Sequence, residues 1–175
     1  MEIKRAGEIM VSLDKYPHIP YWFTLRQAMA EMEHAEFEIG GKKCPPRVLL
    51  VFDEKYQLLG TVRRRDILRG LEPDFLSTLL IDERKKMFDV KSNPDLKQIS
   101  LDKLMKSIEE RVKRPVSDVM RLIKVTADYE DYIIKVIYEM VDNNISVVPV
   151  LKNNQVVGVV RSEDVFHEVA KLLLD

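Results

Sequence analysis

Leu58-Leu59-Gly60-Thr61-Val62-Arg63-Arg64-Arg65-Asp66-Ile67-Leu68 occurs a second time in this chain in altered form, as Val156-Val157-Gly158-Val159-Val160-Arg161-Ser162-Glu163-Asp164-Val165-Phe166. Both copies read apolar-apolar-Gly-x-Val-Arg-x-x-Asp-apolar-apolar. The apolar run before each arginine predicts a strand, and the aspartate, a favoured residue at helix starts, predicts that a helix begins there. Because the order of residue types agrees along the whole stretch, the chain is predicted to contain an internal duplication.

The segments that precede these two stretches also follow one common order. Each unit opens with an acidic residue, an apolar residue and a methionine, in Glu8-Ile9-Met10 and Asp118-Val119-Met120. A helix follows, since apolar residues recur at the i, i+3, i+4, i+7 spacing of one helical face. These residues are Leu25, Ala28, Met29 and Met32 in the first unit and Ile133, Val136, Ile137 and Met140 in the second. Apolar strands at 48–52 and 147–151 complete a predicted strand-helix-strand-strand-helix unit.

The two units differ in length, and a spacer separates them. Fifty positions separate Met10 from Gly60 but 38 separate Met120 from Gly158, so the first unit is 12 residues longer. Most of the excess falls at about 36–46, where Gly-Gly and Pro-Pro predict a loop insertion. We therefore expect a first repeat at 1–71, a helical spacer at 72–114 and a second repeat at 115–175. The spacer has apolar residues at the spacing of an amphipathic helix that Pro115 ends, namely Leu96, Ile99, Leu101, Leu104, Met105 and Ile108.

The composition excludes several function classes. With 28 basic and 29 acidic residues among 175, the net charge of −1 argues against a nucleic-acid strand or an acidic membrane as partner. Cys44 is the only cysteine, which excludes disulfides within the chain and cysteine zinc sites. The six glycines form no phosphate-binding loop, and the three histidines have no metal-ligand spacing. No secretion signal or membrane-spanning run is present, so we expect a cytoplasmic protein. The absence of a phosphate-binding loop and of metal-ligand spacing leads us to expect that it is not an enzyme and requires no metal or cofactor.

The duplicated pattern resembles a tandem pair of cystathionine-beta-synthase (CBS) domains, also called a Bateman module. Val116-Ser117-Asp118-Val119-Met120 is similar to the family's opening segment, Val147-Val148-Pro149-Val150 to its Pro-Val strand, and Gly158 to Asp164 to its closing motif. The resemblance covers nearly the whole chain apart from the spacer and the insertion. It implies an α+β fold in which two β-α-β-β-α repeats pack with pseudo-twofold symmetry, leave two clefts between them and commonly form homodimers.

The resemblance also implies a ligand and the residues that hold it. CBS pairs sense adenosine-containing ligands such as AMP, ADP, ATP or S-adenosylmethionine, and the aspartate that closes the motif, here Asp66 or Asp164, accepts hydrogen bonds from ribose hydroxyls. An aspartate at that place also suits a helix cap, so both roles stay open. The family's adenine slot corresponds in this chain to Val125, Pro149 and Val150.

The chain departs from the family at the position of the motif's hydroxyl residue, where Arg63 and Arg161 stand. An arginine can bind phosphate bidentately and so favour a polyphosphate ligand. It can equally fill the cleft, or pair with a carboxylate and block binding. Leu50 replaces the family's proline in the first unit, so the second unit is expected to be the more intact ligand half.

Two hypotheses follow for the function. The first is a regulatory module that binds an adenine nucleotide in the cleft between the repeats and signals to a separate effector protein by conformational or oligomeric change. The second is a structural or protein-interaction module whose clefts are filled by arginine and whose spacer helix and insertion dock a partner. Catalysis is not supported, because no nucleophile, metal set or acid-base pair converges by spacing.

Overall fold

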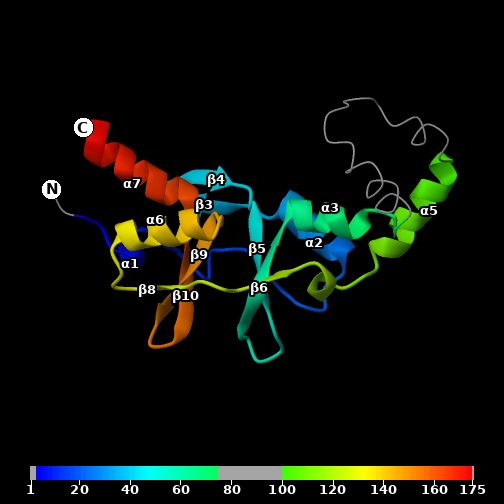
Figure 1. Cartoon of the computed structure of the whole chain (residues 1–175), viewed down its shortest axis with the longest axis horizontal. Helices are drawn as coiled ribbons and strands as arrows, with labels where there is room; N and C mark the ends of the chain where they lie inside the picture. The colour runs from blue at the N-terminus through cyan, green and yellow to red at the C-terminus, as the bar shows by residue number, and fades with distance from the viewer. Residues whose placement is uncertain (1–2, 75–99, 175) are drawn as a thin grey trace.

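A computed structural model describes residues 3–74 and 100–174 of the chain. Within them, the strands form two four-stranded sheets and a separate two-stranded hairpin, and helices pack on the sheets. Figure 1 shows the result as two lobes that lie side by side along the long axis of the molecule. The predicted α+β fold of two strand-and-helix repeats is thereby confirmed.

The first lobe is built around the sheet β2-β5-β6-β7. Its elements are β2 (His18–Pro20), α2 (Leu25–His34), β5 (Val48–Phe52), β6 (Leu58–Arg63), α3 (Arg64–Leu71) and β7 (Arg121–Leu122), with a 3-10 turn at Val116–Asp118. The predicted helix face is confirmed at Leu25, Ala28 and Met32, which are buried in the core of this lobe, whereas Met29 is 38 % exposed. Thr24 caps α2 by accepting a hydrogen bond from the backbone N–H of Gln27 at 3.2 Å.

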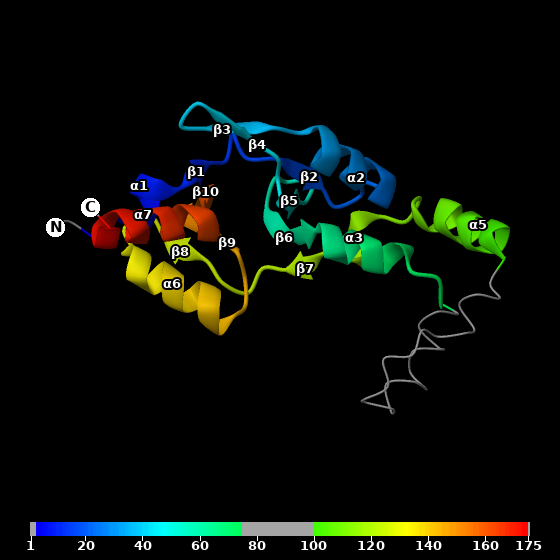
Figure 2. The ribbon, with the colours of Figure 1, turned by 90° about the horizontal axis from the view of Figure 1, so that it is seen from above.

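The second lobe is built around the sheet β1-β10-β9-β8. Its elements are α1 (Ala6–Ile9), β1 (Val11–Ser12), β8 (Ala127–Asp128), α6 (Ile133–Asp142), β9 (Val147–Lys152), β10 (Gln155–Arg161) and α7 (Ser162–Leu174). The apolar face predicted for α6 is confirmed by the burial of Ile133, Val136 and Met140. Figure 2 shows α6 and α7 next to each other, at the end of the molecule that also holds α1.

Each sheet receives one edge strand from the other sequence repeat. β1, from the first repeat, pairs with β10 so that Val11 lies opposite Val159. β7, from the second repeat, pairs with β6 so that Arg121 lies opposite Thr61. Each lobe is therefore composed of segments from both of the repeats predicted at 1–71 and 115–175.

The glycine of the repeated motif is explained by this exchange of edge strands. A Cβ on Gly60 would lie 2.4 Å from the carbonyl oxygen of Arg121, and a Cβ on Gly158 would lie 2.4 Å from that of Val11. Backbone oxygens do not approach a Cβ so closely, so any larger residue would displace the neighbouring strand. Glycine at these two positions thus allows the exchanged strands to join both sheets.

The insertion folds as a hairpin rather than as the predicted loop. β3 (Phe37–Ile39) and β4 (Lys42–Cys44) pair antiparallel, with Phe37 opposite Cys44. Gly40 and Gly41 connect them with φ angles of 55° and 78°, the left-handed backbone that a two-residue hairpin turn of this kind requires. Figure 2 shows the hairpin reaching from the first lobe over β1 and β10 of the second.

Part of the predicted spacer helix is confirmed as α5 (Leu101–Arg111), whereas Leu96 and Ile99 lie outside the described residues. α5 contacts α3 at the far end of the first lobe (Figure 1), and none of its residues is buried. Its Leu101 is 71 % exposed. No helix within residues 3–74 and 100–174 is long and apolar enough to span a bilayer.

Candidate functional site

A cavity of about 670 Å³ lies between the two lobes. Its wall combines β5 and β6 of the first lobe with residues 121–125 and 143–147 of the second repeat. Three of the predicted site residues, Arg63, Val125 and Pro149, are far apart in the sequence, and the fold brings them together in this one cavity.

The cavity wall contains both basic and apolar groups. Arg63 ends β6, Arg121 begins the adjacent strand β7, and Lys124 follows in the connection to β8. Apolar side chains line the wall beside them, from Ile123, Val125 and Pro149. No acidic side chain of the described residues lines this wall, so its charge favours an anionic ligand that also has an apolar part. Within residues 3–74 and 100–174, no group of three His, Cys, Asp or Glu side chains is placed to hold a metal ion.

Asp66 lies behind the basic groups and holds two of them in place. Its side chain is 0 % exposed. Arg63 donates from Nε to Oδ2 at 2.9 Å and from Nη2 to Oδ1 at 3.0 Å, and Arg121 donates from Nε to Oδ1 at 3.1 Å. Arg69 adds a third donor at 3.1 Å. The carboxylate is thus fully buried and engaged by three arginines, so a ribose hydroxyl would reach it only after this cluster had opened.

The same donors determine the charge of Asp66. Burial raises the pKa of a carboxyl group, but hydrogen bonds from Arg63 and Arg121 outweigh burial and lower the pKa of Asp66 from 3.8 to about 2. The hydrogen bond to Asp66 is in turn the main reason that the pKa of Arg63 is raised. The cluster therefore stays ionised at neutral pH and presents net positive charge to the cavity.

Asp66 and Asp164 do not open their helices as the sequence pattern predicts. Both helices begin two residues earlier, so each aspartate stands in the first helical turn. There each carboxylate accepts a hydrogen bond from the backbone N–H of the residue before the helix, at 3.0 Å from Arg63 and at 3.2 Å from Arg161. This is the reciprocal bond of a capping box, so the aspartates stabilise the helix start from inside it.

Arg161 and Asp164 form the equivalent pair in the second repeat, away from the cavity. Arg161 donates from Nε to Oδ2 of Asp164 at 2.8 Å and also bonds Oδ1. Its guanidinium lies 5.2 Å from the centre of the Phe37 ring. Neither member of the pair lines the cavity, and neither does Val150, whose side chain is buried in the core of the second lobe. Ligand contacts by these three residues and by Asp66 stay predictions.

Three residues of the wall, Arg121, Lys124 and Thr61, are not singled out as ligand residues by the sequence pattern. Arg121 directly follows the opening segment of the second repeat, where the first repeat has Val11. A basic residue that distinguishes two otherwise similar repeats is the signal that could have identified it. Thr61 is found only from the strand register, because it lies opposite Arg121.

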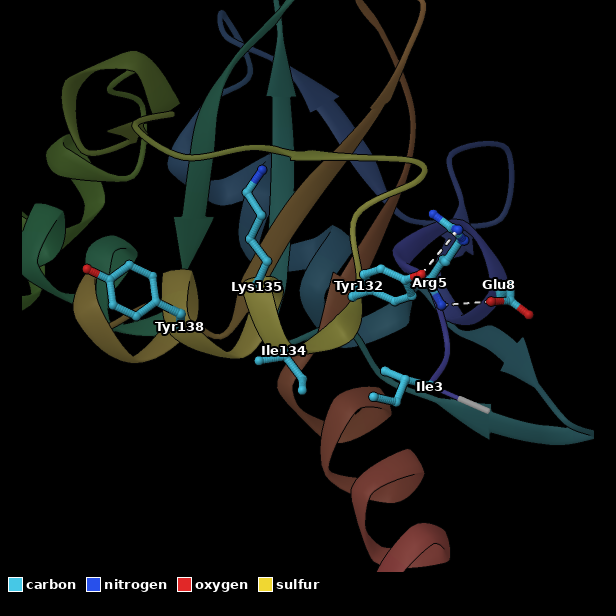
Figure 3. A pocket seen from close by; sticks show the side chains of 7 residues that line it. All are labelled: Ile3, Arg5, Glu8, Tyr132, Ile134, Lys135 and Tyr138. Atoms are coloured by element: carbon cyan, nitrogen blue, oxygen red, sulfur yellow. Dashed lines mark hydrogen bonds between the residues drawn. The ribbon is translucent and has the colours of Figure 1, made fainter. Parts of the chain in front are cut away.

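A second hollow lies over α6 and the N-terminal segment (Figure 3). Arg5 stacks over the Tyr132 ring at 4.6 Å, and its backbone N–H donates to Glu8 at 2.7 Å. Ile134 and Tyr138 project from α6 and are more than half exposed. An open, largely apolar hollow is typical of a contact surface rather than of an enclosed ligand site.

Comparison with known proteins identifies the second repeat and the overall fold. Residues 116–171 match the family model of the CBS domain. A search of curated protein sequences gave no match. A solved CBS domain-containing protein of Bacillus anthracis strain Ames Ancestor has a TM-score of 0.64 at 15 % identity, over 96 % of this chain and 94 % of that chain.

Two further solved structures share the fold of both lobes. CBSX2 in complex with AMP has a TM-score of 0.62 at 14 % identity, over 96 % of this chain and 97 % of that chain. The CBS domain of a CBS domain-containing membrane protein from Sphaerobacter thermophilus has a TM-score of 0.59 at 22 % identity, over 93 % and 86 % of the two chains. Residues 116–171 are therefore a CBS domain, and the chain as a whole has the fold of a tandem CBS pair.

Proposed function

We propose that this chain is a regulatory ligand-sensing CBS-pair module that binds an adenosine-containing nucleotide in the cavity between the lobes. AMP, ADP, ATP and S-adenosylmethionine are the candidate ligands. The observation that carries the proposal is the cavity wall, in which the cations Arg63, Arg121 and Lys124 stand beside the apolar Val125 and Pro149. The AMP complex of the structurally similar CBSX2 supports this class of ligand.

Chemically different groups of the cavity wall are proposed to contact different parts of the nucleotide. Val125 and Pro149 offer apolar surface to a purine ring, and residues 143–146 offer amide and hydroxyl groups to its polar edge. The guanidinium groups of Arg63 and Arg121 supply charge-assisted hydrogen bonds for phosphate. The volume of about 670 Å³ falls within the roughly 300–1,000 Å³ that is typical of small-molecule sites.

Asp66 acts in this proposal as a positioning residue. Its carboxylate receives hydrogen bonds from Arg63 and Arg121, so it fixes both guanidinium groups beside the cavity without touching the ligand. Removing this carboxylate would leave the two cations free to turn away from each other and from a phosphate group.

The proposed signal comes from the position of the cavity between the lobes. A ligand that contacts Arg63 in the first lobe and Pro149 in the second bridges them, and so stabilises one relative arrangement. Such a ligand shifts the equilibrium only as far as it binds that arrangement more tightly than the others. The change is read in the cytoplasm by a separate effector protein or by a second copy of the chain, and the role is regulatory rather than catalytic.

A homodimer through α6 and α7 is the oligomer that we propose. Both helices carry apolar side chains that are largely exposed to solvent, namely Ile134, Tyr138, Val141, Phe166 and Leu173. Exposed apolar groups on adjacent helices are typical of protein contact surfaces. The balanced overall charge, by contrast, offers no basis for a nucleic-acid strand or an acidic membrane as partner.

Thermal unfolding with AMP, ADP, ATP or S-adenosylmethionine tests the proposed function, because a ligand that binds the native state raises the Tm. A ligand at 100 times its Kd stabilises by about 2.7 kcal/mol, which for a chain of this length raises the Tm by roughly 5–10 °C. The variant Arg121→Ala/Lys124→Ala is expected to lose this shift.

The matched control is Arg26→Ala/Lys103→Ala, which removes two exposed cations outside the cavity and is expected to keep the shift. No shift with any of the four ligands at millimolar concentration would refute nucleotide binding. That result would favour the second candidate function, a structural or protein-interaction module with arginine-filled clefts. The bidentate pair of Arg161 and Asp164 is the observation that supports this alternative.

A further inference from the structure

The sequence repeat relates the wall of the open cavity to a second set of positions between the lobes. When the two motif glycines and the two apolar strands are aligned, each wall residue has a counterpart. The wall residues Thr61, Arg63 and Pro149 correspond to Val159, Arg161 and Leu50. Pseudo-twofold symmetry would make these counterparts the wall of a second cleft. They surround no such space, because Leu50 and Val159 belong to a buried apolar cluster.

The β3–β4 hairpin supplies the side chain that fills this place. Phe37 is only 5 % exposed and packs in the same cluster as Leu50 and Val159. The guanidinium of Arg161 lies 5.2 Å from the centre of its ring, and the Tyr16 ring lies 5.3 Å from it. Arg161 therefore faces an aromatic ring of the chain itself, whereas its counterpart Arg63 faces an open cavity.

The other cations of the open cavity also have apolar or aromatic counterparts in the filled cleft. Arg121 corresponds to Val11, since each lies opposite the residue that follows a motif glycine. Lys124 corresponds by strand register to Tyr16. Tyr16 is 2 % exposed and donates its hydroxyl to the backbone carbonyl of Val48 at 2.6 Å. The filled cleft therefore differs from the open cavity both in its shape and in its charge.

We propose that Phe37 and the β3–β4 hairpin permanently occupy the second cleft, so that the chain has one ligand site instead of two. The aromatic ring of Phe37 takes the apolar place between the lobes, and Arg161, held by Asp164, stacks on this ring instead of binding phosphate. The number of ligand sites rests on the proposed function, whereas the filling of the cleft rests on packing alone.

The filled cleft also makes the two sides of the molecule unequal. Phe37 comes from the first repeat and packs in one cluster with Val147 and Val159 of the second lobe. This contact fastens the lobes together on the hairpin side. A change in their separation is therefore confined to the side of the open cavity, where the ligand is proposed to bind.

Isothermal titration with AMP measures the number of sites. The wild-type chain is expected to bind one AMP per chain, and Arg121→Ala/Lys124→Ala is expected to bind none. Two AMP per chain in the wild type would overturn the filled cleft while leaving nucleotide binding intact. Binding of one AMP per chain by the double variant with unchanged affinity would also overturn it, because the binding would then not depend on the cations Arg121 and Lys124 of the open cavity.

A second measurement needs no nucleotide. Phe37→Ala is expected to lower the Tm by about 10 °C, and benzene is expected to restore part of the loss by filling the space of the missing ring. The control Leu68→Ala, on α3 at a side chain that is 63 % exposed and lies outside the proposed dimer surface, is expected to leave the Tm nearly unchanged and to show no response to benzene.

If Phe37→Ala does not fold, Phe37→Leu takes its place and is expected to lower the Tm by less. An unchanged Tm in the Phe37 variant would overturn the proposal. Should AMP fail to bind the wild type, the proposed function fails, and the benzene measurement still decides whether the hairpin fills the cleft.

Discussion

Arg121 donates from its Nε to Oδ1 of Asp66 at 3.1 Å, and this bond joins the two sequence repeats. Arg121 directly follows the opening segment of the second repeat, whereas Asp66 belongs to the closing motif of the first. The same carboxylate also holds Arg63. One buried aspartate thus sets the positions of two cations at the cavity, and the charge presented to a ligand depends on the correct packing of both repeats.

Acid is expected to weaken the fold through Asp66. The pKa of this carboxyl is about 2 in the folded chain against 3.8 as its ordinary value, a difference of about 2 kcal/mol in favour of the folded state. Because the folded pKa is the lower one, this contribution is present above pH 5 and is lost as the pH falls towards 2. Urea unfolding followed across this pH range measures it.

Asp66→Asn isolates the contribution of this carboxylate from that of the other acidic groups. The variant is expected to be less stable than the wild type at pH 7 by about 2 kcal/mol, because an amide cannot balance the arginines around it. Between pH 5 and 2 its stability is expected to fall less steeply than that of the wild type. Glu54→Gln, at an exposed turn residue, is the control. Equal slopes for wild type and Asp66→Asn would show that Asp66 is not the group responsible.

Removal of a single cavity cation is expected to discriminate between ligands. Arg121→Ala and Lys124→Ala should each weaken ATP binding by about tenfold or more, since hydrogen bonds to charged groups contribute about 1.5–3 kcal/mol. S-adenosylmethionine, which has no phosphate, should lose much less affinity. Titration calorimetry of both ligands checks this, with Lys103→Ala as the control. A similar loss for the two ligands would mean that these cations do not bind phosphate.

Gly60→Ala is expected to destabilise the chain by about 2 kcal/mol, the cost of forcing a methyl group into a packed site. The new Cβ would meet the carbonyl oxygen of Arg121 at 2.4 Å and push β7 away from β6. Because β7 carries Arg121, nucleotide affinity should fall as well. Gly40→Asn is the control, since nothing lies within 4 Å of a Cβ there and asparagine tolerates the positive φ. Wild-type stability in Gly60→Ala would contradict the close approach of the two strands.

Ile134→Glu is expected to convert the proposed homodimer to a monomer, because a charge would be buried in an apolar contact. Sedimentation velocity measures the change. Leu101→Glu places the same charge on α5, at a residue that is 71 % exposed, and should leave the dimer intact. A wild-type chain that sediments as a monomer, or an Ile134→Glu variant that remains a dimer, would argue against α6 as the interface.

The local sequence pattern was sufficient to predict the helices and strands of the two repeats, but not the exchange of edge strands between the two sheets. The helix faces of α2 and α6 follow directly from apolar spacing, because burial of one face imposes that period. The pairing of β1 with β10 depends on contacts between residues far apart in the chain, which no local period encodes. The two motif glycines are the only local sign of this pairing that we identify, since only glycine permits the backbone of a neighbouring strand to come so close.

The candidate site could be predicted in part for the same reason. Arg63 at the end of β6, Pro149 on β9 and Val125 in the connection between β7 and β8 all line the cavity, as the resemblance to the family predicts. The resemblance to the family led to Asp66 and Asp164 as ligand contacts, whereas both carboxylates are engaged by arginines that stand where the family has a hydroxyl residue. An ion pair between neighbouring positions of one motif is a matter of side-chain conformation, which sequence spacing alone does not decide.

The pairing of β1 with β10 has a consequence for the newly made chain. Val11 leaves the ribosome long before Val159, its partner in the sheet. At about 5–20 residues per second, the edge strand of the second lobe waits roughly 7–30 s for that partner. During this time the unpaired strand is a template for wrong pairing with other chains. A slowing of translation between the two repeats would lengthen this exposure and reduce the yield of correctly folded protein.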